Sequence, residues 1–226
     1  MGKSYKTEEL MGSLTPFEAK NAPDELFVEG DVSLLTEGLR VAIVGSRKAS
    51  PEGVQRARSF ARALVNHGIT VVSGLAEGID TVAHEAAIQA GGKTIAVLGT
   101  PLSKPYPATN RRLLEEIKNE HLAISQFPEG YPAMRDNFPR RNRTMALVSD
   151  ATVVVEAGEK SGTRHQGWEA IRLGRLVFLM ENVAQNPDLT WPREMIAYGA
   201  QELRREDMPD ILYDIPSFTA GSVSAF

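Results

Sequence analysis

The sequence predicts an α/β protein in which a mostly parallel, doubly wound sheet carries helices on both faces. Three observations support this fold class. Short runs of consecutive apolar residues recur along the chain, most are followed by apolar residues at helical spacing, and glycine often closes the helical stretch. Strands buried on both faces have continuous apolar sequences, and their alternation with helices implies right-handed crossovers between parallel strands.

The first unit illustrates each kind of element. Val41 to Val44 is a continuous apolar run and predicts a buried strand. Ser50 is a favourable cap before Pro51 at the first helical position, and Gly68 ends the helix. Further strands are expected over 69–72, 94–98, 122–125, 151–156 and 176–180, and helices over 79–90, 110–119, 140–148, 164–173 and 194–198.

The ends of the chain are less regular. Residues 1–22 predict a helix-prone or frayed tail, and residues 24–35 predict a strand or turn lying on the main domain. From the length of 226 residues and the order of these elements we expect an N-terminal extension over 1–37 that packs on the core, an α/β main domain over 38–216 and a loose tail over 217–226.

Composition limits the class of protein. Hydrophobic residues make up 42% of the chain and charged residues 24%, which is typical of a globular protein and excludes disorder of the whole chain. The formal net charge is −4. This balance excludes a general polycation that coats nucleic acid, so any anion site must be a local basic patch.

Cysteine is absent, which excludes disulfides, thiolate metal sites and a cysteine nucleophile, and agrees with a reducing compartment. No apolar run reaches the roughly 20 residues of a membrane span, and the N-terminus has no apolar signal segment. We therefore expect a cytoplasmic protein that does not enter membranes.

Candidate binding residues follow the predicted strands, because ligands of such sheets bind outside the carboxyl ends of the strands. Gly45, Ser46 and Arg47 follow the first strand. The glycine allows close backbone approach, and the arginine offers a planar fork for phosphate. Ser73 and Gly74 follow the second strand in a loop whose N–H groups can face an anion.

The turn after strand 151–156 is polar and glycine-bearing, and is also suited to phosphate. Its candidate residues are Lys160, Ser161, Gly162 and Thr163. The turn lacks the spacing of a Walker A loop, no GxGxxG follows the first strand, and no GxSxG elbow is present. The sequence therefore supports no dinucleotide cofactor, and we expect no cofactor at all.

Asp80 and His84 share a helical face, which raises the possibility of a catalytic or metal-binding pair. No third ligand has usable spacing, so we interpret Asp80 as a hydrogen-bond acceptor at the helix start and His84 as a residue satisfied against the backbone. No metal is expected. The proline-rich segment with Tyr106 and Pro107 is interpreted as structural, and Asn110 as the cap of the following helix.

The segment from Arg135 to Arg143 is the most unusual part of the sequence. It contains four arginines and one aspartate, a local charge of +3 in an acidic chain. Phe138 lies within this segment, two residues before Arg140. Aromatic stacking combined with phosphate contacts is the mode by which proteins hold single-stranded nucleic acid, so this segment favours anion binding over a solvated helix face.

Taken together and in order, several segments resemble the DNA-processing protein A family, also called DprA or Smf. The matching segments are VAIVGSR, SGLAEGID, TIAVLGT, FPRRNR and VVVEA with KSGT, extending from about Leu26 to Met180. The resemblance implies an extended Rossmann-like domain that binds single-stranded DNA without nuclease activity. It also implies a homodimer that hands the strand to the recombinase RecA during natural transformation.

The resemblance further implies which residues form the DNA pocket. Phe138 would stack a base, and the turn at Lys160 would contact phosphate from the opposite side. The residues carried over by position are Gly45, Ser46, Arg47, Phe138, Arg140, Arg141, Asn142, Arg143, Lys160, Ser161 and Gly162.

Two alternatives remain open. One is a sensor that binds a nucleotide or nucleotide-derived ligand in the same pocket. The other is a nucleoside-monophosphate phosphoribohydrolase of the related LOG type, in which Gln166 stands where the catalytic glutamate is expected. An amide cannot act as a general base, so we expect no enzymatic activity and no catalytic residue.

Overall fold

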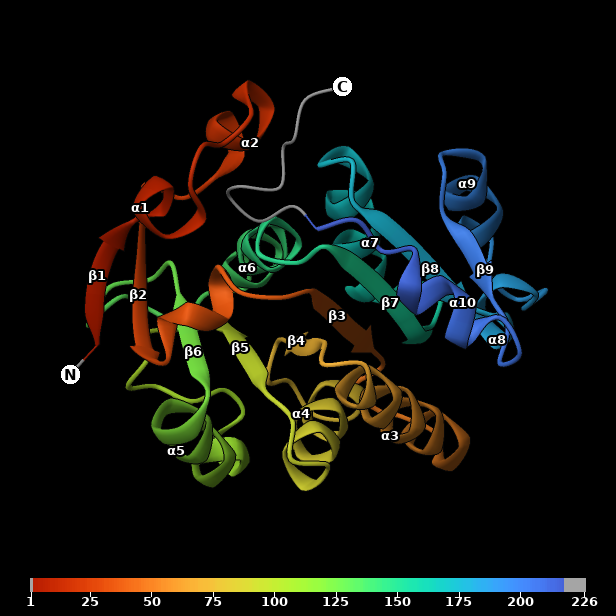
Figure 1. Ribbon diagram of the computed structural model, residues 1–226, viewed down its shortest axis with the longest axis horizontal. Coiled ribbons are helices and arrows are strands. Elements are labelled where there is room, and N and C mark those ends of the chain that lie inside the picture. The colour runs from red at the N-terminus through yellow and green to blue at the C-terminus, as the bar shows by residue number, and fades with distance from the viewer. Residues whose placement is uncertain (1, 218–226) are drawn as a thin grey trace.

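A nine-stranded sheet in the order β1-β2-β6-β5-β4-β3-β7-β8-β9 organises the chain in the computed structural model, which describes residues 2–217 (Figure 1). Every strand from β6 to β9 in this order runs parallel to its neighbour, whereas β1 and β2 are antiparallel. The strands are β1 Lys3–Lys6, β2 Glu25–Gly30, β3 Arg40–Gly45, β4 Thr70–Ser73, β5 Thr94–Leu98, β6 Leu122–Ser125, β7 Ala151–Glu156, β8 Leu176–Met180 and β9 Gln201–Leu203.

Helices cover both faces of this sheet, as Figure 1 shows. The α-helices are α1 Thr7–Met11, α2 Pro16–Asn21, α3 Pro51–Asn66, α4 Ile79–Gln89, α5 Arg111–Glu120, α6 Asn137–Leu147, α7 Thr163–Arg172, α8 Glu181–Ala184, α9 Trp191–Ala197 and α10 Met208–Tyr213, with short 3-10 turns at Val32–Leu35 and Ala108–Asn110. The predicted fold class is confirmed. None of the helices in residues 2–217 combines the length and apolarity needed to cross a membrane.

Alternate residues of the central strands build two separate parts of the core. Val41 and Ile43 of β3 pack in the cluster that includes α3 and α4, whereas Ala42 and Val44 pack in the cluster that includes α6 and α7. Both faces are therefore apolar, which explains the continuous hydrophobic run in this strand.

Local signals at helix starts were mostly reliable. The Ser50 hydroxyl accepts a hydrogen bond from the Gly53 N–H at 2.9 Å, and Pro51 is the first helical residue, both as predicted. The expectation for Asn110 was wrong: its side chain does not cap α5. It donates instead to the Leu75 carbonyl at 3.0 Å and to the Thr81 hydroxyl at 2.8 Å, joining two loops.

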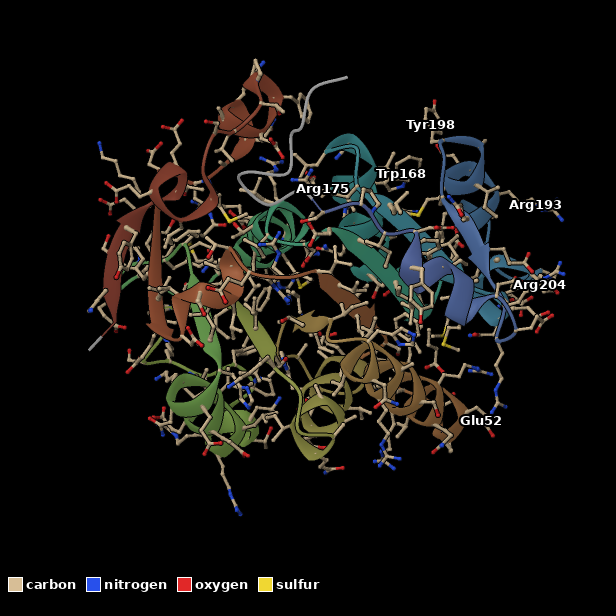
Figure 2. The ribbon with its side chains drawn as sticks, viewed as in Figure 1. Glu52, Trp168, Arg175, Arg193, Tyr198 and Arg204 are labelled. Atoms are coloured by element: carbon tan, nitrogen blue, oxygen red, sulfur yellow. The ribbon has the colours of Figure 1, made fainter. Side chains whose placement is uncertain are left out.

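Of the two expectations for residues 1–22, the helix-prone one is confirmed by α1 and α2, whereas the frayed tail is wrong for residues 2–22, which also form β1. β1 pairs with β2, and β2 pairs with β6, so both strands extend the sheet. Arg175, which follows α7 and is labelled in Figure 2, forms a buried ion pair with Glu18 of α2. The strand expected within 24–35 is confirmed as β2. Apart from residue 217, the tail expected over 217–226 lies outside the described residues.

The order of the strands creates a switch point between β3 and β7. From β3 the chain moves outward through β4 and β5 to β6, and it then returns to place β7 on the other side of β3. The connections that follow β3 and β7 therefore leave in opposite directions. In sheets of this kind, such divergence opens a crevice at the carboxyl ends of the two strands.

Candidate functional site

A pocket of about 640 Å³ lies at this switch point, and we call it the switch-point pocket. Its walls come from the turn after β3, the loop leading into α4, helix α6, and the turn that joins β7 to α7. The lining residues are Val44, Gly45, Ser46, Arg47, Lys48, Ala76, Asp80, Phe138, Pro139, Arg141, Asn142, Met145, Gly158, Lys160, Ser161, Gly162, Thr163, His165 and Gln166.

Hydrogen bonds hold the two turns of the pocket together. The Thr163 hydroxyl, at the start of α7, donates to the carbonyl of Gly45 at 3.1 Å. On the outer side, the Glu156 carboxylate at the end of β7 accepts from the Ser50 N–H at 3.0 Å. Since these bonds join segments far apart in the sequence, the two turns form one rigid rim.

An aromatic ring from α6 and a guanidinium from the turn after β3 meet at the wall of the pocket. Phe138, in the first turn of α6, is half-buried. The guanidinium carbon of Arg47 lies 5.4 Å from the centroid of its ring, within the range of a cation–π contact. The predicted meeting of the loop after β3 with the basic segment at Phe138 is therefore present in the fold.

Three exposed cations surround the opening. Arg47 and Lys48 come from the turn after β3, and Lys160 comes from the turn after β7. Within residues 2–217, no carboxylate lies within ion-pair distance of any of the three. Their charges are thus available to an anionic ligand at the mouth of the pocket.

A buried charged pair forms the floor. Arg141 is 5% exposed, and its Nη1 atom lies 3.8 Å from Asp80 Oδ2. Burial raises the pKa of Asp80 and lowers the pKa of Arg141, and the attraction between the two charges opposes both shifts. Among the described residues, Arg141 Nε has no hydrogen-bond partner. A buried donor without a partner is costly, so burying this guanidinium beneath the pocket costs free energy that the rest of the fold must offset.

Gly74 makes room for this arginine. A Cβ at this position would lie 1.2 Å from Arg141 Nη1, so the guanidinium can take this place only beside a glycine. Its N–H donates to Asp80 Oδ2 at 3.2 Å. Ser73 is fully buried and donates to the Ile43 carbonyl at 2.7 Å. The expectation that Ser73 and Gly74 face an anion is corrected here, because the loop lies beneath the pocket and supports the Asp80–Arg141 pair.

The basic segment is divided by the helix that carries it. Asn142 and Arg141 face the switch-point pocket, and Asn142 Nδ2 donates to the Gly162 carbonyl at 3.3 Å. Arg140 and Arg143 instead line a different cavity, of about 970 Å³, beside the N-terminal segment. Successive residues of a helix point in different directions, so Arg140, Arg141 and Arg143, which were expected to act together, do not share one pocket.

The side chains of Arg140 and Arg143 are also engaged elsewhere. Arg140 Nη1 donates to the Tyr131 hydroxyl at 3.1 Å, and its guanidinium lies 5.1 Å from the centroid of the Phe127 ring. Arg143 Nε donates to Glu169 at 3.1 Å. The expected pocket roles of these two arginines are therefore corrected: both lie on the other side of α6.

Sequence reasoning missed several lining residues. Lys48 follows Arg47 directly, so its charge was a usable signal. Met145 and His165 carried none, because only the directions of α6 and α7 bring them to the pocket. Thr163 was predicted as a binding residue, yet it is buried and its hydroxyl is occupied by Gly45.

Gln166 belongs to the wall between α6 and α7. With its amide oriented to satisfy both atoms, the nitrogen donates to the Asn142 carbonyl at 2.6 Å and the oxygen accepts from the Ala146 N–H at 3.3 Å. His84 is buried beneath the pocket, and its Nδ1 atom lies 2.7 Å from Thr94 Oγ1. Within residues 2–217, no group of three His, Cys, Asp or Glu side chains could hold a metal ion.

Comparison with known proteins agrees with this architecture. The family model of DNA recombination-mediator protein A matches residues 9–216. Protein Smf of Escherichia coli is 40% identical over 179 residues, which cover 79% of this chain and 48% of that protein. The chain thus spans about half the length of the curated relatives it matches.

Solved structures share the fold. DNA processing protein A from Streptococcus pneumoniae superposes with a TM-score of 0.81 at 34% identity, covering 96% of this chain and 75% of that one. DNA processing protein A from Helicobacter pylori, described for its single-stranded DNA binding mode, superposes with a TM-score of 0.78 at 24% identity, covering 94% of each chain. The second likeness concerns the fold alone.

Proposed function

The chain belongs to the DNA recombination-mediator protein A family, and from this premise we propose that it binds single-stranded DNA in the switch-point pocket without cleaving it. The observation that carries the proposal is the convergence of Arg47, Phe138 and Lys160 on one pocket. A ring for stacking and cations for phosphate are the two components that single-strand binding requires.

Charge distribution supports a polyanionic ligand. The whole chain is acidic, with a net charge of −4, yet the mouth of the pocket presents Arg47, Lys48 and Lys160 together. Arg141 lines the floor of the same pocket, beside Asp80. A phosphate chain with bases can engage the mouth and the floor at once, which a simple anion cannot do.

The position of Gln166 supports binding without catalysis. Its amide is used to join α7 to the main chain of α6, and an amide does not exchange protons as a catalytic glutamate does. On the basis of family membership, the proposal includes a cytoplasmic homodimer that passes the bound strand to a RecA-type recombinase in DNA recombination and natural transformation.

The test is a titration of labelled oligo-dT at several salt concentrations, followed by fluorescence anisotropy. Each phosphate contact with single-stranded DNA contributes a log–log slope of about −0.7, so the three cations at the mouth predict a slope of about −2. Free nucleotides should compete weakly, because one phosphate cannot reach all three cations. The oligonucleotide should be recovered intact.

Two other results would replace the proposal. Tight binding of a mononucleotide with no affinity for oligo-dT would identify a nucleotide sensor. Release of free base from a nucleoside monophosphate would identify a phosphoribohydrolase.

A further inference from the structure

Tyr106 is an exposed aromatic side chain next to the switch-point pocket, and the binding site described above does not use it. Half of its surface, 50%, is accessible. Its ring centroid lies 5.2 Å from that of Phe138, and the two ring planes are inclined by 51°. Tyr106 comes from the loop after β5, so it lies along the same edge of the sheet as the pocket.

The loop holds this ring in a fixed position. The Thr100 hydroxyl donates to the Lys104 carbonyl at 2.6 Å, and the Lys104 N–H donates to the Pro101 carbonyl at 2.9 Å. Pro105 and Pro107 flank the tyrosine and restrict the backbone further. An exposed aromatic side chain that is already ordered loses little conformational entropy when it binds a ligand.

The angle between the rings decides how many bases they can hold. A base stacks with its plane parallel to that of the aromatic ring, so a base parallel to Phe138 cannot also be parallel to Tyr106. We propose that Tyr106 stacks a second base of the same strand, adjacent to the base that stacks on Phe138. This inference rests on the proposed function, because it extends the same binding site.

Basic residues flank Tyr106 in the sequence. Lys104 precedes it, and Arg111 and Arg112 occupy the first turn of α5; all three are exposed. In the described part of the chain, none of them has a carboxylate within ion-pair distance. Two cations in the first turn oppose the helix dipole, but they attract phosphate.

The dimensions of the sheet fit this path. Strand β5 is two positions from β3 in the sheet, and strands are spaced by about 4.8 Å, so the two loops are separated by roughly 10 Å. The ring centroids of Phe138 and Tyr106 are closer than this, 5.2 Å apart, so neighbouring bases of one strand can reach both rings. The strand would therefore leave the pocket over the end of β5, towards α5.

The experiment compares oligo-dT affinity among variants at fixed salt. Tyr106→Ala should weaken binding by about 5- to 150-fold, the usual range for one stacked base, and Tyr106→Phe should bind like the unmodified protein. The salt slope should stay unchanged in Tyr106→Ala, because no charge is removed, and it should become flatter in Lys104→Ala. Tyr213→Ala, which removes an exposed ring from α10, is the matched control.

A double-mutant cycle separates stacking from a structural role. If each ring holds its own base, the double variant should bind oligo-dT more weakly than either single variant; because the two rings touch, the two losses need not add exactly. Normal affinity in Tyr106→Ala together with a loss in Phe138→Ala would overturn the inference and leave the proposed function intact. The inference would also be overturned if the double variant bound oligo-dT as tightly as Phe138→Ala alone. A third contrary result would be a change in the oligomeric state of Tyr106→Ala, measured by light scattering, that explains its lower affinity. If every variant, including Phe138→Ala, bound oligo-dT as tightly as the unmodified protein, the proposed function itself would be rejected.

Discussion

Gly74 and Arg141 are in such close contact that a methyl group on the glycine would lie 1.2 Å from the Nη1 atom of the arginine. Gly74→Ala must therefore displace a buried guanidinium from Asp80. Separating a buried ion pair costs about 3 to 5 kcal/mol, so we expect a loss of that order in the free energy of unfolding, measured by urea denaturation.

Gly158→Ala is the matched control for this change. A Cβ at Gly158 would have no neighbour within 4 Å, so the free energy of unfolding should change by less than about 0.5 kcal/mol. Equal stability of the two variants would show that Arg141 is not held as the structure places it.

Arg47 and Arg140 should respond differently to removal of charge. Arg47 lines the switch-point pocket, whereas Arg140 lines the cavity on the other side of α6. Arg47→Ala should weaken oligo-dT binding and flatten the log–log salt slope by about 0.7. Arg140→Ala should leave the slope unchanged. If only Arg140→Ala gave a flatter salt slope, the DNA would lie in the cavity beside the N-terminal segment and not in the switch-point pocket.

Phe138→Ala should cost about 1 to 3 kcal/mol of binding free energy, because one base loses its stacking partner. The measurement is oligo-dT affinity by fluorescence anisotropy at a single salt concentration. Phe17→Ala is the control, since Phe17 is an exposed ring on α2 that does not line the pocket. Equal affinities of the two variants would contradict the stacking role.

Gln166→Glu tests whether the pocket lacks only a carboxylate to become an enzyme. The new carboxylate would face the Asn142 carbonyl, now 2.6 Å from the amide nitrogen, so one hydrogen bond becomes a repulsion. We expect a loss of about 1 to 3 kcal/mol in stability and no release of base from nucleoside monophosphates, assayed by chromatography. Appearance of free base would favour the phosphoribohydrolase alternative.

His84 should make the protein less stable in acid. Burial lowers the pKa of His84 from its ordinary 6.5 to about 3, so between these values the unfolded chain binds more protons than the folded one. The free energy of unfolding must then decrease as the pH falls through this window. His84→Gln removes this contribution. As the pH is lowered from about 7 to about 4, the free energy of unfolding of His84→Gln should therefore decrease less than that of the unmodified protein in urea titrations. Parallel pH profiles would disprove the assignment.

Local sequence signals were sufficient for the central strands and most of the helices. Burial on both faces demands continuous apolar runs such as 41–44, and the Ser50–Pro51 start of α3 depends only on neighbouring residues. The turns at Arg47 and Lys160 could also be found in advance, because the carboxyl ends of parallel strands share one edge of the sheet. These features could be predicted because each depends on residues that are neighbours in the sequence or on a general property of parallel sheets.

Tertiary structure decided the pairing of the N-terminal strands and the directions of the side chains on α6, because both depend on residues far away in the sequence. Strand β1 pairs with β2, which in turn pairs with β6, and residues 1–22 showed no local signal for this strand. Likewise, α6 begins at Asn137 and turns Arg141 into the floor of the pocket while directing Arg140 away from it. Periodicity reports which residues belong to a helix, but only packing against the sheet determines which way each side chain points.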